Sequence, residues 1–274
     1  MTQLVQYLQG DDVVCRELPN ASEHVLPGVT WGESWRTFTP AYWVAQMWMS
    51  EIDQKPVSPF SATGTLAEEV AFCLLGGFGI TAELAGAAFD ACSAAGLVSG
   101  LCTDATAWTS VLRQPLDQAG RTVRYRYPNQ KAVYLAAAMG AISQGLVDTS
   151  SGKALRDSLL AIQGIGPKTA GWVARNVLDT DEVAILDIHI VRAGLLCNLY
   201  SFEQKVERDY FAMEAQFLAL CRGLGVRPAM LDCIIWTEMR ELGPVVHQAL
   251  DRRRGAPAPP VDRTAPTLAH CVAW

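Results

Sequence analysis

Apolar residues recur at helical spacing through most of the chain, and strict alternation of apolar and polar residues is rare. Thr65 and Glu68 form a capping box before one apolar run, and Gly76 and Gly77 end that run. The pattern predicts helices at about 40–53, 65–75, 81–98, 104–114, from 128 onward, 151–162, 167–178, 188–199, 203–222 and 228–242. We therefore expect a mainly α protein, with one short strand at 13–16.

The composition is that of a folded protein. Half of the 274 residues are hydrophobic and eight are Trp, enough for one large domain or two modest lobes. The formal net charge of -6 weighs against nucleic-acid binding, because Lys and Arg neutralise phosphates. Two basic clusters can still create a local positive surface, although both also fit a solvated surface: Arg121, Arg124 and Arg126, and Arg252, Arg253 and Arg254.

The cysteines show none of the spacings that hold a metal. None of the eight forms a CxxC pair or lies near a His at zinc spacing, so we expect neither zinc nor an iron–sulfur cluster. The first residues lack the charged and apolar regions of a signal peptide, and the most apolar stretch, 132–142, is too short to span a bilayer. We expect a cytoplasmic protein with reduced thiols and no membrane association.

The segment SLLAIQGIGPKTAGWVARN, residues 158–176, gives the first sign of function. One helix ends, glycines make a tight turn, and Pro167 opens the next helix, where proline is favoured. Such a turn lets a phosphate approach the backbone, and the free N–H groups of a first helical turn attract anions. The residues expected to bind the DNA backbone without reading its sequence are Gly164, Ile165, Gly166 and Thr169.

Lys168 and Asp187 add chemistry to this hairpin. Lys168 lies in the first helical turn, where the helix dipole and partial burial disfavour a second positive charge and favour the nucleophilic neutral amine. Asp187 follows the apolar run VAIL and precedes a predicted helix, as an N-cap residue does. An ionised carboxylate there can stabilise a positively charged sugar. Taken singly, Lys168 also fits a phosphate-binding or surface lysine, and Asp187 a plain helix cap.

Together these residues resemble the helix-hairpin-helix glycosylase superfamily, whose motif combines the hairpin, a Gly/Pro-rich loop and an Asp. The loop reads GIGPK and the Asp stands in LDIHI. The resemblance is strong over about 155–195, and the helical layout agrees over about 64–245. A Lys at position 168 implies an enzyme that also cleaves the abasic strand. The cysteines that would hold an iron–sulfur cluster are missing. This absence, together with the segments LDIHIVRAG and LDCIIWTEMRE, makes the chain most similar to the 8-oxoguanine DNA glycosylase branch.

The resemblance implies a mainly α fold of two helical lobes with a DNA-binding cleft between them. Residues 1–63 would contribute to the first lobe, and 64–186 would form a helical domain with the helix-hairpin-helix at 155–178. Residues 187–254 would close the other lobe. The Pro-rich residues 255–274 are expected to form a linker or tail.

The resemblance also implies a mechanism. A modified base is flipped out of duplex DNA, and Lys168 attacks the sugar carbon C1′ with Asp187 as its partner carboxylate. A Schiff base and β-elimination follow. No metal or organic cofactor is expected, apart from a monovalent cation at the hairpin. The expected partner is double-stranded DNA containing a modified base, bound by a monomer.

Base flipping needs a wedge and a pocket. Tyr125 with Arg126 is one candidate wedge, and Phe78 in GGFGI is another, although a basic loop and a core Phe fit the same residues. Candidate pocket walls are Trp43, Trp48 and Trp236, but Trp at helical spacing is usually core. His189 is interpreted as structural rather than catalytic.

The sequence leaves the excised base open. The resemblance favours oxidised guanine. The alternative is a hypermodified base, such as the glucosylated hydroxymethylcytosine of phage DNA, whose excision would serve antiviral defence. Two alternatives of other classes are a non-catalytic helix-hairpin-helix DNA-binding module and a helical scaffold; Lys168 and Asp187 argue against the first.

Overall fold

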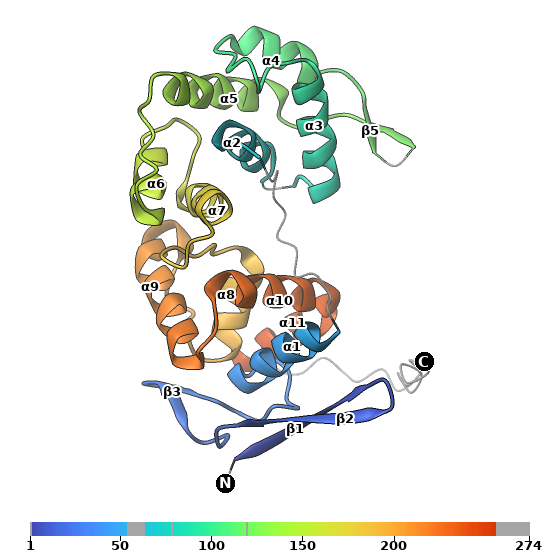
Figure 1. The fold of residues 1–274 in the computed structure, drawn as a ribbon, viewed down its shortest axis with the longest axis vertical. Coiled ribbons are helices and arrows are strands. Elements are labelled where there is room, and N and C mark those ends of the chain that lie inside the picture. The colour runs from blue at the N-terminus through green and yellow to red at the C-terminus, as the bar shows by residue number, and fades with distance from the viewer. Residues whose placement is uncertain (1, 54–63, 78, 119, 256–274) are drawn as a thin grey trace.

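A computed structural model describes residues 2–53, 64–77, 79–118 and 120–255 of the chain, and these residues form a mainly helical fold (Figure 1). They contain eleven helices and three two-stranded antiparallel sheets. The mainly α prediction is therefore confirmed. None of the helices in these ranges has the length and apolarity needed to cross a membrane.

The helices fall into two groups, before and after the turn at 160–166. Those before the hairpin are α1 (Pro40–Ile52), α2 (Leu66–Leu75), α3 (Ala82–Ala94), α4 (Ala105–Leu112), α5 (Pro128–Ser143) and α6 (Gly152–Leu159). Those after it are α7 (Pro167–Leu178), α8 (Ile188–Leu196), α9 (Val206–Leu224), α10 (Pro228–Glu241) and α11 (Gly243–Arg253). The paired strands are β1 (Gln3–Gln9) with β2 (Asp12–Leu18), β3 (His24–Leu26) with β4 (Val29–Thr30), and β5 (Leu116–Gln118) with β6 (Arg121–Val123).

Side-chain caps explain where several helices begin. Thr39 caps α1 and Thr81 caps α3, and the capping box of Thr65 with Glu68 opens α2 as predicted. Three predicted helices end early by three residues or more, because α3 stops at Ala94, α6 at Leu159 and α8 at Leu196. The helix α11 was not predicted, and the strand expected at 13–16 lies within the longer β2.

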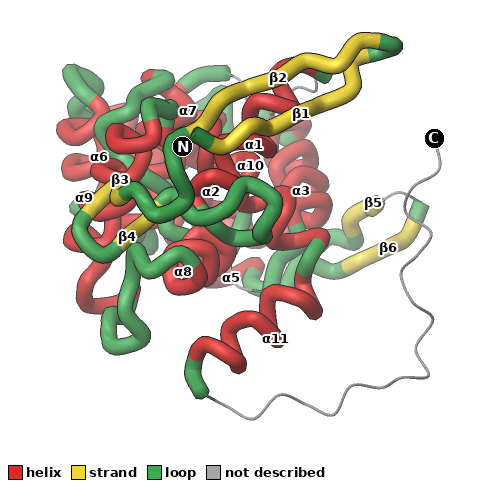
Figure 2. The backbone as a smooth tube through the Cα atoms, turned by 90° about the horizontal axis from the view of Figure 1, so that it is seen from below, coloured by secondary structure: helices red, strands yellow, loops and turns green. Residues whose placement is uncertain are grey.

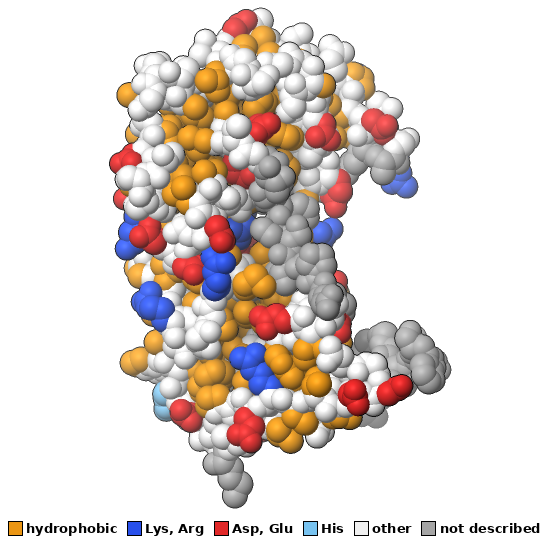
Figure 3. All heavy atoms as spheres, viewed as in Figure 1, with side chains coloured by type: hydrophobic (Ala, Val, Ile, Leu, Met, Phe, Trp, Pro, Cys, Tyr) orange, Lys and Arg blue, Asp and Glu red, His pale blue; other side chains and the backbone are white. Residues whose placement is uncertain are grey.

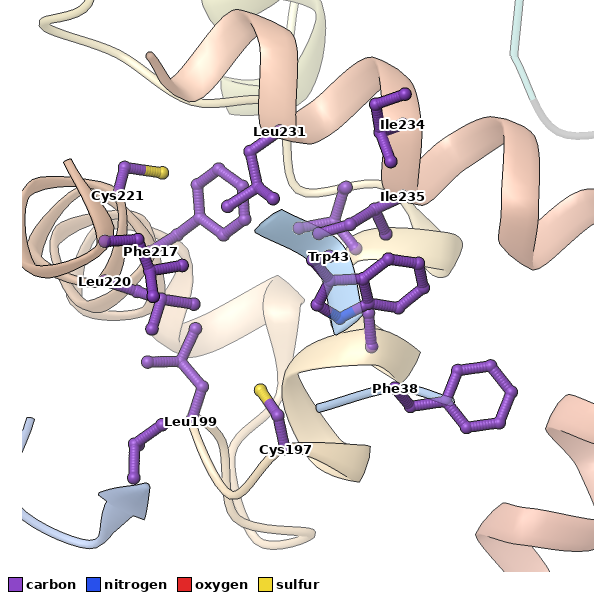
Figure 4. Packing of buried hydrophobic residues seen from close by; sticks show 14 of the residues in the cluster. Phe38, Trp43, Cys197, Leu199, Phe217, Leu220, Cys221, Leu231, Ile234 and Ile235 are labelled. Atoms are coloured by element: carbon purple, nitrogen blue, oxygen red, sulfur yellow. The ribbon is translucent and has the colours of Figure 1, made fainter. Parts of the chain in front are cut away.

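The buried hydrophobic residues form two clusters, and the chain passes from one cluster to the other between Val183 and Ala184. We call residues 2–53 and 184–255 the terminal lobe. In its cluster, side chains from α1, α8, α9 and α10 surround Trp43 (Figure 4). The cluster of the central lobe, residues 64–183, contains Trp108 and Met139, both fully buried. The N-terminal segment therefore packs with helices α8 to α11, below the central lobe in Figure 1.

The hairpin β5–β6 packs against α3 at its base, where Leu116 is buried in the central cluster, and its turn projects from the central lobe (Figure 2). Its turn is closed by the Asp117 carboxylate, which accepts a hydrogen bond from the Gly120 N–H at 2.8 Å, and Gly120 has a φ of +78°. Each strand has three residues, which is too short for alternation to be recognised in the sequence.

Two buried ion pairs join the lobes. Arg156 on α6 donates from Nη1 to Glu214 Oε2 on α9 at 2.5 Å, and Arg175 on α7 pairs with Asp232 on α10. The other Glu214 oxygen accepts from the Ala184 N–H at 3.0 Å. Burial raises the pKa of Glu214, which the Ala184 and Arg156 contacts oppose. These pairs fix how the lobes face each other.

The Arg156–Glu214 pair should matter for stability because removing one partner leaves a buried charge. We expect Glu214→Ala to lower the free energy of unfolding by about 3–5 kcal/mol in urea denaturation. Glu83→Ala is the comparison, since the Glu83–Arg240 pair also joins the lobes, at 3.7 Å, but is exposed on both sides. Equal losses of unfolding free energy in the two variants would contradict a larger contribution of the buried pair to stability.

Candidate active site

The hairpin between α6 and α7 is anchored by Ile165. This side chain is buried in the central cluster, and its N–H donates to the Ile162 carbonyl at 3.2 Å. Ile165 therefore holds the turn in place, and its N–H is not available to a phosphate. The prediction that Ile165 itself contacts DNA is wrong on this point. Gly164 and Gly166 are exposed, and Thr169 is half-buried.

Gly164 meets two demands that only glycine satisfies. Its φ is +89°, a region that other residues rarely adopt. A Cβ at this position would also lie 2.1 Å from Tyr134 Cγ, because the Tyr134 ring on α5 lies directly under the turn. The turn is thus close-packed on α5, with Gln130 Nε2 donating to the Tyr134 hydroxyl at 3.0 Å.

The hairpin places Lys168 at the start of α7. Gly166 is the N-cap and Pro167 the first helical residue, as predicted, and the first helical hydrogen bond runs from the Ala170 N–H to the Gly166 carbonyl at 2.9 Å. The N–H groups of Lys168 and Thr169 thus precede the first helical bond. Lys168 is exposed, so the expected partial burial is wrong.

Asp187 is the N-cap of α8, as predicted. Its Oδ1 accepts from the N–H groups of His189 at 2.8 Å and Ile190 at 2.9 Å. Both capping bonds use the same oxygen, so Oδ2 does not take part in the cap. The side chain is half-buried, and its position is set by the first turn of α8.

Lys168 and Asp187 line one cavity of about 630 Å³ between the lobes. The central lobe contributes one face of α7, on which Lys168, Trp172 and Arg175 follow at helical spacing. The terminal lobe contributes residues of α10, together with Asp187. The space-filling view shows the outline hollowed between the lobes on the right (Figure 3).

Aromatic side chains and a buried carboxylate line the cavity. Of these residues, only Trp236 was a candidate from the sequence. Trp172 packs edge-to-face on Phe72 with ring centroids 6.3 Å apart, and the Lys168 Nζ lies 5.8 Å from the Trp172 centroid. Asp232 lies one helical turn before Trp236 on α10. The available signals were Trp172 four residues after Lys168, and a charged residue within the apolar run LDCIIW.

The wedge prediction needs correction at Tyr125. This side chain is only 4% exposed, and its hydroxyl donates to the Leu75 carbonyl at 2.6 Å, so it is a core residue that cannot enter a base stack. Arg126 is exposed, and its guanidinium lies against Gly79 and 5.1 Å from the Tyr127 centroid. Phe78 lies outside the described residues.

The three tryptophans proposed as pocket walls lie in different environments. Trp43 is 1% exposed in the centre of the terminal lobe, so its assignment to the pocket is wrong. Trp48 is half-buried and is not among the residues that line the cavity, whereas Trp236 lines it. His189 packs edge-on against Trp236 with centroids 6.2 Å apart, and burial lowers its pKa.

No metal site is evident in the part of the chain that the structure describes, where no three His, Cys, Asp or Glu side chains gather. The described cysteines are free thiols. Lys168 and Asp187 are thus the ionisable pair that the hairpin and the α8 cap bring to the cavity.

Comparison with known proteins adds to this geometry. A family model described as 8-oxoguanine DNA glycosylase matches residues 59–226. The 8-oxoguanine DNA glycosylase/AP lyase of Thermoplasma acidophilum is 30% identical over 138 residues, 49% of this chain and 65% of that protein. The protein of the same description from Saccharolobus islandicus is 28% identical over 126 residues, 42% of this chain and 60% of that one. The aligned part spans less than two thirds of either relative.

Solved structures share the fold. The 8-oxoguanine DNA glycosylase of Thermotoga maritima has a TM-score of 0.52 at 21% identity and covers 73% of this chain and 97% of its own. That of Methanocaldococcus jannaschii has a TM-score of 0.54 at 22% identity and covers 74% and 94%. The family match spans more than half of the chain and contains the hairpin, Lys168 and Asp187. The chain belongs to the 8-oxoguanine DNA glycosylase family.

Proposed function

We propose that this protein is a DNA glycosylase with AP lyase activity that excises oxidised guanine from duplex DNA. The observation that carries the proposal is the meeting of Lys168 and Asp187 in one cavity, each fixed by the first turn of a different helix. Relatives named 8-oxoguanine DNA glycosylase/AP lyase support the choice of base. The target base has to leave the stack to reach this cavity.

Lys168 acts as the nucleophile in this proposal. Its neutral amine attacks C1′, the glycosidic bond breaks, and the base leaves with the bonding electrons and takes up a proton. The amine loses its protons as the sugar ring opens to a Schiff base. Loss of a proton from C2′ then expels the 3′ phosphate by β-elimination, and water releases the enzyme.

Asp187 stabilises positive charge in the same proposal. Its Oδ1 is held by two N–H groups of α8, which leaves Oδ2 to face charge that develops on the sugar. A carboxylate fixed in this way needs no reorganisation during the reaction. Asp187 therefore acts on the departing base's sugar rather than on the base.

The exposed backbone at Gly164, Gly166 and Thr169 would grip a phosphate, and a monovalent cation would use carbonyl oxygens of the same turn. No step depends on another cofactor. Free thiols fit a reducing cytoplasm, and a cavity lined by one chain fits a monomer acting on duplex DNA.

Base release tests the proposal directly. A duplex with one 8-oxoguanine should lose that base and then be nicked, with the released base identified by mass. Lys168→Gln and Asp187→Asn should each slow release by more than about 100-fold. Asn is also a good N-cap, so Asp187→Asn should keep its thermal stability and separate chemistry from folding. Tight duplex binding without release would instead support the non-catalytic module.

Two glycines of the hairpin provide a test variant and a matched control for the binding of the DNA backbone. Gly164→Ala forces a side chain into the Tyr134 ring at positive φ, which should cost about 1–3 kcal/mol and weaken abasic-duplex binding at least tenfold. Gly166→Ala has open space and negative φ, so binding should change little. Fluorescence anisotropy at one salt concentration measures both. If Gly164→Ala binds like the wild type, the hairpin is not the grip.

The cavity favours a second candidate substrate. Pockets of about 300–1,000 Å³ hold drug-sized ligands, and the 630 Å³ here exceeds what a flat base fills. Four polar residues that precede the family match line it: Tyr7, Gln46, Ser50 and Asp53. The Tyr7 hydroxyl donates to Asp53 Oδ1 at 2.7 Å, which fixes part of this wall. This wall suits a base with a hydroxyl-rich substituent, such as glucosylated hydroxymethylcytosine, whose removal would serve antiviral defence.

Phage DNA separates the two substrates. If the polar wall binds the substituent, glucosylated hydroxymethylcytosine should be released at least tenfold faster than the same base without its sugar, since hydrogen bonds to charged groups are strong. The two DNAs differ only in the sugar, so they control for each other. Release of oxidised guanine alone would contradict the second candidate and leave the first intact.

A further inference from the structure

The segment that leads from the central lobe to Asp187 is buried. Residues 183–186 lie between α7 and α8, outside any helix or strand, and all four are buried. A buried backbone outside regular structure has to find partners for its N–H and C=O groups elsewhere, because an unpaired group costs free energy. The partners of this segment therefore determine where its backbone runs, and Asp187 follows directly after it.

Two side chains of α9 provide those partners. The Tyr210 hydroxyl donates to the Ala184 carbonyl at 3.0 Å and accepts from the Leu186 N–H at 3.2 Å. Glu214, one turn further along α9, accepts from the Ala184 N–H at 3.0 Å. Burial raises the pKa of Tyr210, so the hydroxyl keeps the proton that it donates. One hydroxyl thus bridges two peptide groups directly before Asp187.

The same segment lies against the helix that carries Lys168. A Cβ at Gly171 of α7 would lie 3.0 Å from the Ala184 carbonyl oxygen and 3.8 Å from the Tyr210 hydroxyl, so glycine allows this close approach. Gly171 comes three residues after Lys168, and Ala184 comes three residues before Asp187. The two backbones that carry the proposed catalytic groups therefore meet at the Ala184 carbonyl.

We propose that Tyr210 is a positioning residue that sets the place of Asp187 relative to Lys168. Tyr210 is not among the residues that line the cavity, so it acts through the backbone of residues 184–186. A displacement of about 1 Å at a reacting group can cost about 100-fold in rate. The inference rests on the proposed function, since it takes the Asp187 carboxylate as the group that stabilises charge on the sugar.

Removal of the hydroxyl alone tests this role. Tyr210→Phe keeps the ring but leaves the Ala184 carbonyl and the Leu186 N–H without their partner. Base release is measured in single turnover on the duplex that the wild type acts on, with 8-oxoguanine or glucosylated hydroxymethylcytosine. We expect release to slow about 10- to 100-fold. Binding to an abasic duplex should stay within about threefold of the wild type, because the hairpin at 160–166 is unchanged.

A double-mutant cycle separates positioning from stability. If Tyr210 acts through Asp187, Tyr210→Phe should slow release by only about threefold or less in a protein that already carries Asp187→Asn, because no carboxylate is left to position. A tyrosine that only stabilises the fold would slow release by the same factor in both backgrounds. The ratio of the two factors therefore measures the coupling between Tyr210 and Asp187.

Tyr200→Phe is the matched control. Tyr200 is also buried in the terminal lobe, and its hydroxyl donates to the Met213 carbonyl of α9 at 3.1 Å. The variant loses a buried hydrogen bond of the same kind, made to α9 rather than to residues 184–186. Its thermal stability should fall, whereas base release should stay within about threefold of the wild type.

Gly171→Ala reaches the same carbonyl from the other side. Its methyl group would press on the Ala184 carbonyl from α7, so release should slow, again with little further effect in the Asp187→Asn background. This variant keeps every hydrogen bond of Tyr210 available, and it tests the inference even if Tyr210→Phe does not fold.

The outcomes distinguish the inference from the proposed function. Release at the wild-type rate in Tyr210→Phe, an equal loss in Tyr200→Phe, or the same factor with and without the Asp187 carboxylate would each overturn the role of Tyr210. None of these results would contradict the proposed function. A wild type that releases neither base, or an Asp187→Asn variant that releases it at the wild-type rate, would contradict the proposed function itself.

Discussion

The course of the backbone between α6 and α7 is the constraint on which the site depends. Ile165 is buried in the central lobe, and Gly164 turns at positive φ with the Tyr134 ring directly beneath it. Gly166 and Pro167 then start α7, so Lys168 can occupy only the first helical turn. The same turn that leaves N–H groups free for a phosphate thus delivers the amine to the cavity.

Because the cavity lies between the lobes, its two charged groups come from different lobes. Lys168 comes from the central lobe, while Asp187 caps a helix of the terminal lobe. The ion pairs Arg156–Glu214 and Arg175–Asp232 join the two lobes that carry the amine and the carboxylate. Both members of the second pair also line the cavity.

Much of this was predictable from local signals. Caps, glycine stops and apolar spacing predicted ten of the helices, and the Gly166–Pro167 start and the Asp187 cap were each predicted and found. The failures at Tyr125 and Asp232 share a cause: they depend on contacts distant in sequence. Tyr125 looks like an exposed aromatic until its contact with Leu75 is seen, and Asp232 looks like a helix residue until Arg175 pairs with it. The short strands of β5–β6 give too few residues for a pattern.

In the proposed reaction the Lys168 amine becomes covalently bonded to DNA. Borohydride reduction during reaction with an 8-oxoguanine duplex would fix a Schiff base as a stable adduct, and peptide mapping by mass spectrometry would locate it. We expect one adduct, on the tryptic segment that contains Lys168, formed as fast as the base is released. An adduct on another lysine, or base release with no adduct, would contradict it.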